Sequence, residues 1–120
     1  MTQYEKILLL ENEYVNKNGT FNSEILNNNK VLLYIQSLTC GYCKKVHKDV
    51  EELANKYYKN GLIVITLIVG SNDYNTIISK LENKIQKFNG VPTYILFNNG
   101  KLIKQHSGAM QFNTLENFIN

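Results

Sequence analysis

Two cysteines, Cys40 and Cys43, are the residues best suited to covalent chemistry in this 120-residue chain, which has no other cysteine. A cysteine reacts as its thiolate, which a free side chain with a pKa of roughly 8.5 forms only in part at neutral pH. With two residues between them, the second sulfur can return to the first over one helical turn. The motif Cys40-Gly41-Tyr42-Cys43 therefore predicts an exchange between dithiol and disulfide.

The flanking segments place this motif where a strand ends and a helix begins. An apolar run at 31–35 precedes it, and apolar residues recur after it at helical spacing, at Val46, Val50, Leu53, Ala54, Tyr57 and Tyr58. The first turn of a helix has unpaired N–H groups and the positive end of the helix dipole, which favour a thiolate. We expect Cys40 to attack a substrate disulfide there and the more shielded Cys43 to resolve the mixed disulfide, with Lys44 and Lys45 adding positive field.

Two other uses of the cysteine pair stay open. A structural disulfide over so short a loop would remove little entropy from the unfolded chain and would stabilise it weakly. A zinc site could combine Cys40, Cys43 and His47 with a distant His106, but the strong zinc pattern has two paired motifs and this chain has one. We therefore expect His47 to be an ordinary surface residue and His106 to be an ordinary residue on a strand face. We also expect no metal and no other cofactor, since the sequence has no glycine-rich phosphate-binding motif.

Composition and charge narrow the class of protein. The hydrophobic fraction of 43% is typical of a soluble globular domain, and the net charge of +3 comes from scattered lysines without any arginine. That pattern argues against a nucleic-acid partner. The polar start and the short apolar run at 7–10 predict neither a signal peptide nor a membrane span. We expect a cytoplasmic protein, where a lone cysteine pair is more often catalytic or metal-binding than structural.

Apolar runs and turn residues predict the elements of the first half. Strands are expected at 7–10, 31–36 and 62–69, and a short helix through Leu26 is expected after a cap at Asn22 or Ser23. The helix that carries the cysteines should run to about residue 59 and end at Asn60-Gly61. Strand, helix and strand over this length imply a parallel pair with a right-handed crossover.

In the second half of the sequence, the residue pattern predicts a helix, a β-hairpin and a final helix. Apolar spacing favours one helix that reaches Phe88 and is closed by Asn89-Gly90; its apolar residues are Ile77, Ile78, Leu81, Ile85 and Phe88. Strands are expected at 93–97 and 101–106 around a tight turn, and a helix after them. The prediction is one α/β domain over residues 1–120, with a mixed sheet of four to five strands flanked by helices.

With these elements the chain resembles the thioredoxin family over most of its length, best from residue 31 to 109. The resemblance is carried by the junction at Cys40-Gly41-Tyr42-Cys43, by Val91-Pro92 before the hairpin and by Gly108-Ala109 after it. It implies a thioredoxin fold, Cys40 as the attacking thiol, Cys43 as the resolving thiol and a cis-proline at Pro92 beside the two sulfurs.

The resemblance also implies a place for an extended protein segment. The backbone of Val91 would pair with that segment as an added strand does. Five residues would form the wall of a shallow groove around it, namely Tyr42, Val91, Pro92, Gly108 and Ala109.

Three positions depart from the pattern of thioredoxins proper. Thr39 stands in place of a tryptophan, Gly41-Tyr42 in place of Gly-Pro, and Tyr34 in place of a buried aspartate that faces a lysine on the next strand. In thioredoxins proper, the aspartate and the lysine relay a proton for the second cysteine. The expected strand at 62–69 has no charged residue, so the relay for Cys43 is absent here or built from other groups. The Gly-Tyr dipeptide is similar to bacterial disulfide isomerases, and the segment before Pro92 is expected to enlarge the preceding helix.

The function expected from these features is reduction of protein disulfides by the Cys40/Cys43 pair. A disulfide isomerase or oxidase of the same fold is the alternative, and a non-catalytic module that binds a metal or a partner is a third reading. The expected partners are disulfide-containing proteins and a reductase or small thiol for recycling. We expect a monomer that binds neither nucleic acid nor membrane.

Overall fold

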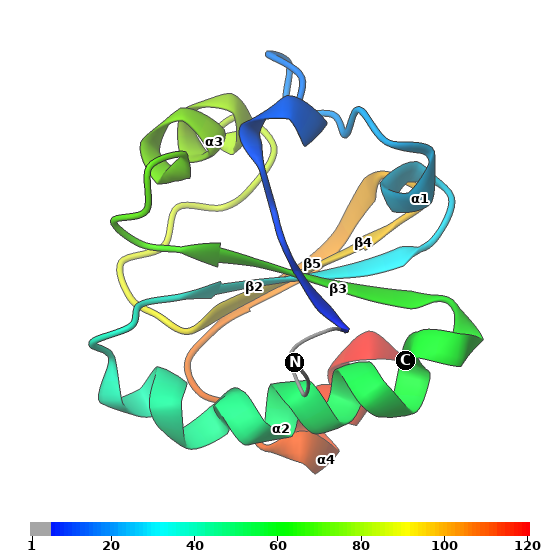
Figure 1. The fold of residues 1–120 in the computed structure, drawn as a ribbon, viewed down its shortest axis with the longest axis vertical. Helices are drawn as coiled ribbons and strands as arrows, with labels where there is room; N and C mark the ends of the chain where they lie inside the picture. The colour runs from blue at the N-terminus through cyan, green and yellow to red at the C-terminus, as the bar shows by residue number, and fades with distance from the viewer. Residues whose placement is uncertain (1–5) are drawn as a thin grey trace.

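A five-stranded mixed sheet runs through the middle of the computed structural model, which describes residues 6–120 (Figure 1). Its strands are β1 (Ile7–Leu9), β2 (Lys30–Gln36), β3 (Leu62–Ile68), β4 (Thr93–Asn98) and β5 (Lys101–Ser107), in the spatial order β1-β3-β2-β4-β5. Strand β2 pairs parallel with β3 and antiparallel with β4. The parallel unit and the hairpin therefore meet at β2, and the mixed sheet of the predicted fold class is confirmed.

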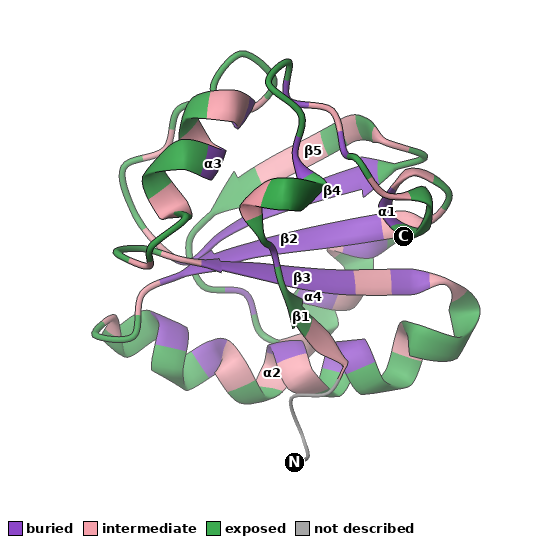
Figure 2. Cartoon of the chain, turned by 45° about the horizontal axis from the view of Figure 1, so that its top comes forward, coloured by how far each residue is buried: buried purple, intermediate pink, exposed green. Residues whose placement is uncertain are grey.

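Helices cover both faces of this sheet. Helices α1 (Glu24–Asn27) and α3 (Tyr74–Leu81) lie on one face, and α2 (Gly41–Tyr57) and α4 (Phe112–Ile119) lie on the other (Figure 1). Each face has its own apolar core. Leu32 and Tyr34 of β2 pack toward α2 and α4, whereas Leu33 and Ile35 pack toward the opposite layer. Strand β2 is thus buried on both sides, as its continuous apolar run predicts (Figure 2).

Local signals account for most element ends. The hydroxyl of Ser23 accepts a hydrogen bond from the Leu26 backbone N–H at 3.4 Å and caps α1. Helix α2 passes into a short 3₁₀ turn at Tyr58–Asn60, and Gly61 ends it with a φ of 89°. A second 3₁₀ turn, Asn12–Tyr14, follows β1. These ends fall where the turn and capping residues predict them.

The helix predicted to reach Phe88 is much shorter than expected. Helix α3 ends at Leu81, and residues 82–92 form no regular element. Ile85 and Phe88 lie outside the helix but still pack partly buried against the core on that face. The side-chain amide of Gln105 accepts from the Gln86 N–H and donates to the Gln86 carbonyl, each at 2.9 Å. The helix prediction was wrong beyond Leu81 because irregular chain buries the same apolar residues, and the backbone of Gln86 bonds to the Gln105 side chain of β5 instead of to a further helical turn.

No helix within residues 6–120 is both long enough and apolar enough to cross a membrane.

Candidate active site

The two cysteines lie at the start of α2, with Cys40 as the residue that caps the helix. The sulfur of Cys40 accepts a hydrogen bond from the backbone N–H of Cys43 at 3.1 Å. Both side chains are free thiols; Cys40 is half-buried, whereas Cys43 is 1% exposed. The structure thus places one accessible and one shielded sulfur within a single helical turn, at the end where the helix dipole is positive.

The chain before β4 returns to the same place. The Cys40 thiol donates to the carbonyl oxygen of Val91 at 3.5 Å, across 51 residues of sequence. The Val91–Pro92 peptide bond is cis. The backbone N–H of Gly108, just beyond β5, donates to the Pro92 carbonyl at 2.9 Å. Cys40, Val91, Pro92 and Gly108 therefore form one connected region around the start of β4 and the end of β5.

The other two residues expected to form the groove lie further apart. Tyr42 is 67% exposed on the first turn of α2. Ala109 lines a cavity between α2 and α4 whose other residues are Lys45, Val46, Asp49, Met110, Gln111 and Thr114. A single groove that joins Tyr42 to Ala109 stays a prediction.

A buried phenol lies beneath the cysteine turn at the position where the family carries an acid. Tyr34 has no solvent exposure, and its hydroxyl donates to the Cys43 carbonyl oxygen at 3.4 Å. Its ring stacks on Tyr94 with centroids 5.6 Å apart. Burial raises the pKa of Tyr34 far above its ordinary range and raises the pKa of Tyr94 to about 12. Neither phenol can act as an anion at neutral pH.

The Cys43 thiol is protonated at neutral pH. Burial, and next the hydrogen bond between the two cysteine side chains, raise the pKa of Cys43 to about 11. The chemistry expected of Cys43 therefore requires that its proton be removed as it reacts.

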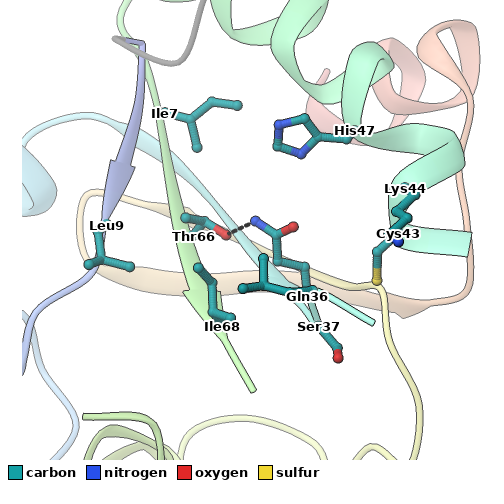
Figure 3. A pocket seen from close by; sticks show the side chains of 10 residues that line it. Ile7, Leu9, Gln36, Ser37, Cys43, Lys44, His47, Thr66 and Ile68 are labelled. Carbon is teal, nitrogen blue, oxygen red and sulfur yellow. Dashed lines mark hydrogen bonds between the residues drawn. The ribbon is translucent and has the colours of Figure 1, made fainter. Parts of the chain in front are cut away.

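A cavity of about 610 Å³ lies beside Cys43, between α2 and the strands β1, β2 and β3 (Figure 3). Its wall is partly apolar, from Ile7, Leu9, Leu38 and Ile68, and partly polar, from Gln36, Ser37, Cys43, Lys44, His47 and Thr66. The Gln36 amide donates to the Thr66 hydroxyl at 2.9 Å, and that hydroxyl donates to the Tyr34 carbonyl at 2.8 Å. The sequence reasoning missed Gln36 and Thr66; the available signal was a polar residue within each of two otherwise apolar strands.

His47 is not the surface residue that the sequence predicted. Its side chain is 23% exposed, and its Nε2 lies 4.0 Å from Oε1 of Glu51, one turn further along α2. The reason is its position one turn after Cys43, on the helix face that turns toward the sheet. His106, by contrast, lies on β5 as expected, and it is exposed there. Among residues 6–120, no three His, Cys, Asp or Glu side chains gather as a group that could hold a metal ion.

The family follows from a comparison with known families, in which the model described as a thioredoxin-like domain matches residues 21–120. This chain belongs to the thioredoxin-like family. It is 28% identical over 133 residues to 453L, named as a thioredoxin-like protein of Invertebrate iridescent virus 6, across 97% of this chain and 94% of that protein. It is also 28% identical over 106 residues to C1F5.02 of Schizosaccharomyces pombe, named as a protein disulfide-isomerase. That match covers 88% of this chain but 20% of the yeast protein.

Two solved structures share the fold of this thioredoxin-like chain. Mitochondrial thioredoxin 3 from Saccharomyces cerevisiae, in its oxidized form, superposes with a TM-score of 0.70 at 23% identity, over 98% of this chain and 97% of that one. Thioredoxin from Fasciola hepatica superposes with a TM-score of 0.62 at 21% identity, over 78% of this chain and 81% of that one. Fold, family and the paired cysteines together support a redox role.

Proposed function

We propose that this thioredoxin-like chain is a thiol–disulfide oxidoreductase that reduces disulfides in proteins. The observation that carries the proposal is the hydrogen bond from the Cys43 N–H to the Cys40 sulfur at 3.1 Å, at the first turn of α2. A backbone donor and the positive end of a helix dipole both suit a negatively charged sulfur. Cys40 is also the more accessible of the two thiols, so it is the one that a substrate disulfide can reach.

The reaction follows in two exchanges. The Cys40 thiolate attacks one sulfur of the substrate disulfide; a bond forms between Cys40 and that sulfur, and the other substrate sulfur leaves as a thiolate. Cys43 then loses its proton and attacks Cys40, which forms the Cys40–Cys43 disulfide and releases the second substrate thiolate. The substrate gains two electrons and the cysteine pair loses two. A separate reductase or a small thiol would restore the dithiol.

The surroundings of Cys40 also support a way to hold the substrate. The Val91 carbonyl lies 3.5 Å from the Cys40 sulfur, so an extended segment paired with this backbone would bring its own cysteine to the reactive thiol. We propose the connected region of Val91, Pro92 and Gly108 as the centre of that binding surface, with Tyr42 and Ala109 at its edges.

The test is reduction of a disulfide-containing protein such as insulin in the presence of dithiothreitol. The parent should accelerate it, and Cys40→Ser should abolish the acceleration. Cys43→Ser, first reduced and then incubated with the substrate without dithiothreitol, should instead accumulate a covalent adduct at Cys40, seen as an increase in intact mass that added thiol reverses. Ser79→Ala, an exposed serine on α3 across the sheet, is the matched control and should behave as the parent. An active Cys40→Ser variant would contradict the proposal.

A disulfide isomerase or oxidase is the second candidate, because it uses the same chemistry in another direction. The Gly41-Tyr42 dipeptide and the likeness to a protein named as a disulfide-isomerase favour it. The equilibrium of the Cys40–Cys43 pair against a glutathione buffer separates the two candidates. A strongly reducing pair supports the reductase, and an oxidising pair supports the isomerase or oxidase.

A further inference from the structure

When Cys43 attacks the mixed disulfide, its proton must pass to an acceptor, and the residue at the position of the usual buried aspartate, Tyr34, is not one. This step rests on the proposed function, in which Cys43 attacks the mixed disulfide. Burial keeps Cys43 protonated at neutral pH. Tyr34 lies directly beneath it, but its hydroxyl acts as a hydrogen-bond donor and its burial disfavours the phenolate. Another group must therefore take the proton.

His47 is placed to do so by the geometry of α2. Residues four apart on a helix are neighbours on one face, so His47 and Cys43 lie on the same side of α2. The His47 ring itself extends toward Ile7 of β1, and its Nε2 lies 4.0 Å from Glu51 Oε1, so a proton from Cys43 would have to cross the cavity to reach it (Figure 3). Both residues line the same cavity of about 610 Å³, where the His47 ring extends from α2 over the Gln36–Thr66 pair (Figure 3).

The chemistry of the other lining residues singles out the imidazole. The Lys44 side chain is exposed, and a lysine ammonium group has hydrogen-bond donors but no acceptor. Ser37 and Thr66 present hydroxyl groups and Gln36 presents an amide, and none of these groups takes up a proton near neutral pH. A neutral imidazole accepts a proton near neutral pH.

We propose that His47 is the proton acceptor for Cys43 and that it acts through water in the cavity that both side chains line. The cavity has the room and the polar partners that water needs. As the Cys43 proton passes to the imidazole, the Cys43 sulfur forms its bond to Cys40, and the bond from Cys40 to the substrate sulfur breaks. The departing thiolate or the solvent then takes up the proton from the imidazolium.

Charged residues of α2 lie around His47. Glu51 Oε1 lies 4.0 Å from Nε2, and the other charged residues of α2 around His47 are Lys44, Lys48 and Glu52. Among residues 6–120, the strand side chains that face His47 carry no charge at neutral pH; they are Ile7 on β1, Tyr34 and Gln36 on β2, and Thr66 on β3.

A stopped-flow experiment with dithiobis(nitrobenzoate) separates the two exchanges. The attack of Cys40 releases one coloured thiolate in a first phase, and the attack of Cys43 releases a second. In His47→Gln the first phase should stay as in the parent, and the second should slow by on the order of 10²-fold at neutral pH. The second phase of the parent should rise through the range where imidazoles titrate and then level. In His47→Gln it should keep rising toward the pKa of the Cys43 thiol.

His106→Gln makes the same change at the exposed histidine of β5 and should match the parent in both phases. Added imidazole should accelerate the second phase of His47→Ala but not that of the parent. A His47→Gln variant with the parent's rate and pH profile would overturn the proposal and leave the proposed function standing. A second-phase rate that is reduced equally at every pH and is not restored by imidazole would also overturn the proposal, because a purely structural role of His47 produces that result. If the parent lacks the second phase, as Cys43→Ser should, the proposed function itself fails.

Discussion

The hydroxyl of Tyr34 donates to the carbonyl oxygen of Cys43 at 3.4 Å, and both residues are buried. Tyr34 belongs to the central strand β2 and Cys43 to the first turn of α2. The contact joins the reactive turn to the most buried strand of the sheet. The ring of Tyr34 also stacks on Tyr94 of β4, so one side chain connects three elements beneath the site.

Two substitutions at Tyr34 distinguish the contribution of its hydroxyl to stability from the contribution of its ring. Tyr34→Phe removes one long hydrogen bond and should cost about 1 kcal/mol of unfolding free energy. Tyr34→Ala also removes the buried ring and should cost about 3–5 kcal/mol. Urea denaturation of the reduced protein measures both values. Equal losses in the two variants would mean that the hydroxyl, and not the stacked ring, carries the stability.

The buried thiol of Cys43 should make stability fall at alkaline pH. Its pKa rises from an ordinary value of 9.0 to about 11 in the folded protein, so the folded state keeps a proton that the unfolded state releases. The stabilisation is complete below about pH 9 and is lost as the pH rises through about 11, by about 2–3 kcal/mol in total. Denaturation under reducing conditions should show this loss in the parent. The loss should be smaller by that amount in Cys43→Ala, and equal pH dependence in both proteins would contradict the assignment.

A charged contact between α2 and α4 should weaken in acid. Glu116 Oε2 accepts from Lys56 Nζ at 2.6 Å and from the Tyr57 hydroxyl at 2.7 Å, and these bonds lower the pKa of the Glu116 carboxyl. Because the folded state favours the carboxylate, this contribution is present above the ordinary value of 4.5 and disappears as the pH falls through the lowered pKa. The contribution is small, since the Lys56 side chain is 56% exposed.

Melting curves across the acid range measure this effect. Glu116→Gln should melt slightly below the parent at neutral pH and should approach it in acid. Glu82→Gln, the same change beside α3 on the other face of the sheet, is the matched control and should stay close to the parent throughout. If the difference in melting temperature between Glu116→Gln and the parent grows in acid, the Glu116 carboxylate does not stabilise the fold through this contact.

Gly19 should tolerate alanine less well than Gly61, although both have a positive φ, of 86° and 89°. A Cβ at Gly19 would lie 2.8 Å from the Lys80 carbonyl oxygen of α3, whereas at Gly61 the nearest atom is 3.5 Å away. Gly61→Ala should cost roughly 1–2 kcal/mol from backbone strain alone. Gly19→Ala should cost a further 1–3 kcal/mol from overpacking. Chemical denaturation compares the two, and equal costs would show that the loop moves freely away from α3.

Much of this protein could be predicted from local sequence. The apolar runs of β2 and β3 specify buried strands, Ser23 and Gly61 mark helix ends, and the spacing of the cysteines indicates one helical turn. These signals succeed because strand burial, capping and turns depend on residues within a few positions of one another. The helix expected to reach Phe88 failed because apolar spacing alone does not tell a helix from irregular chain that buries the same side chains.

The sequence by itself thus determined the spacing of the cysteine pair and the order of strands and helices, and it pointed to a redox role. The family resemblance placed Val91-Pro92 near the sulfurs, but only the tertiary structure decided that the Cys40 thiol donates to the Val91 carbonyl, and that His47 shares a cavity with Cys43, Gln36 and Thr66. The physical reason is that these relationships join separate elements across the sheet. Their distances follow from how whole helices pack on strands, which no local pattern of residues records.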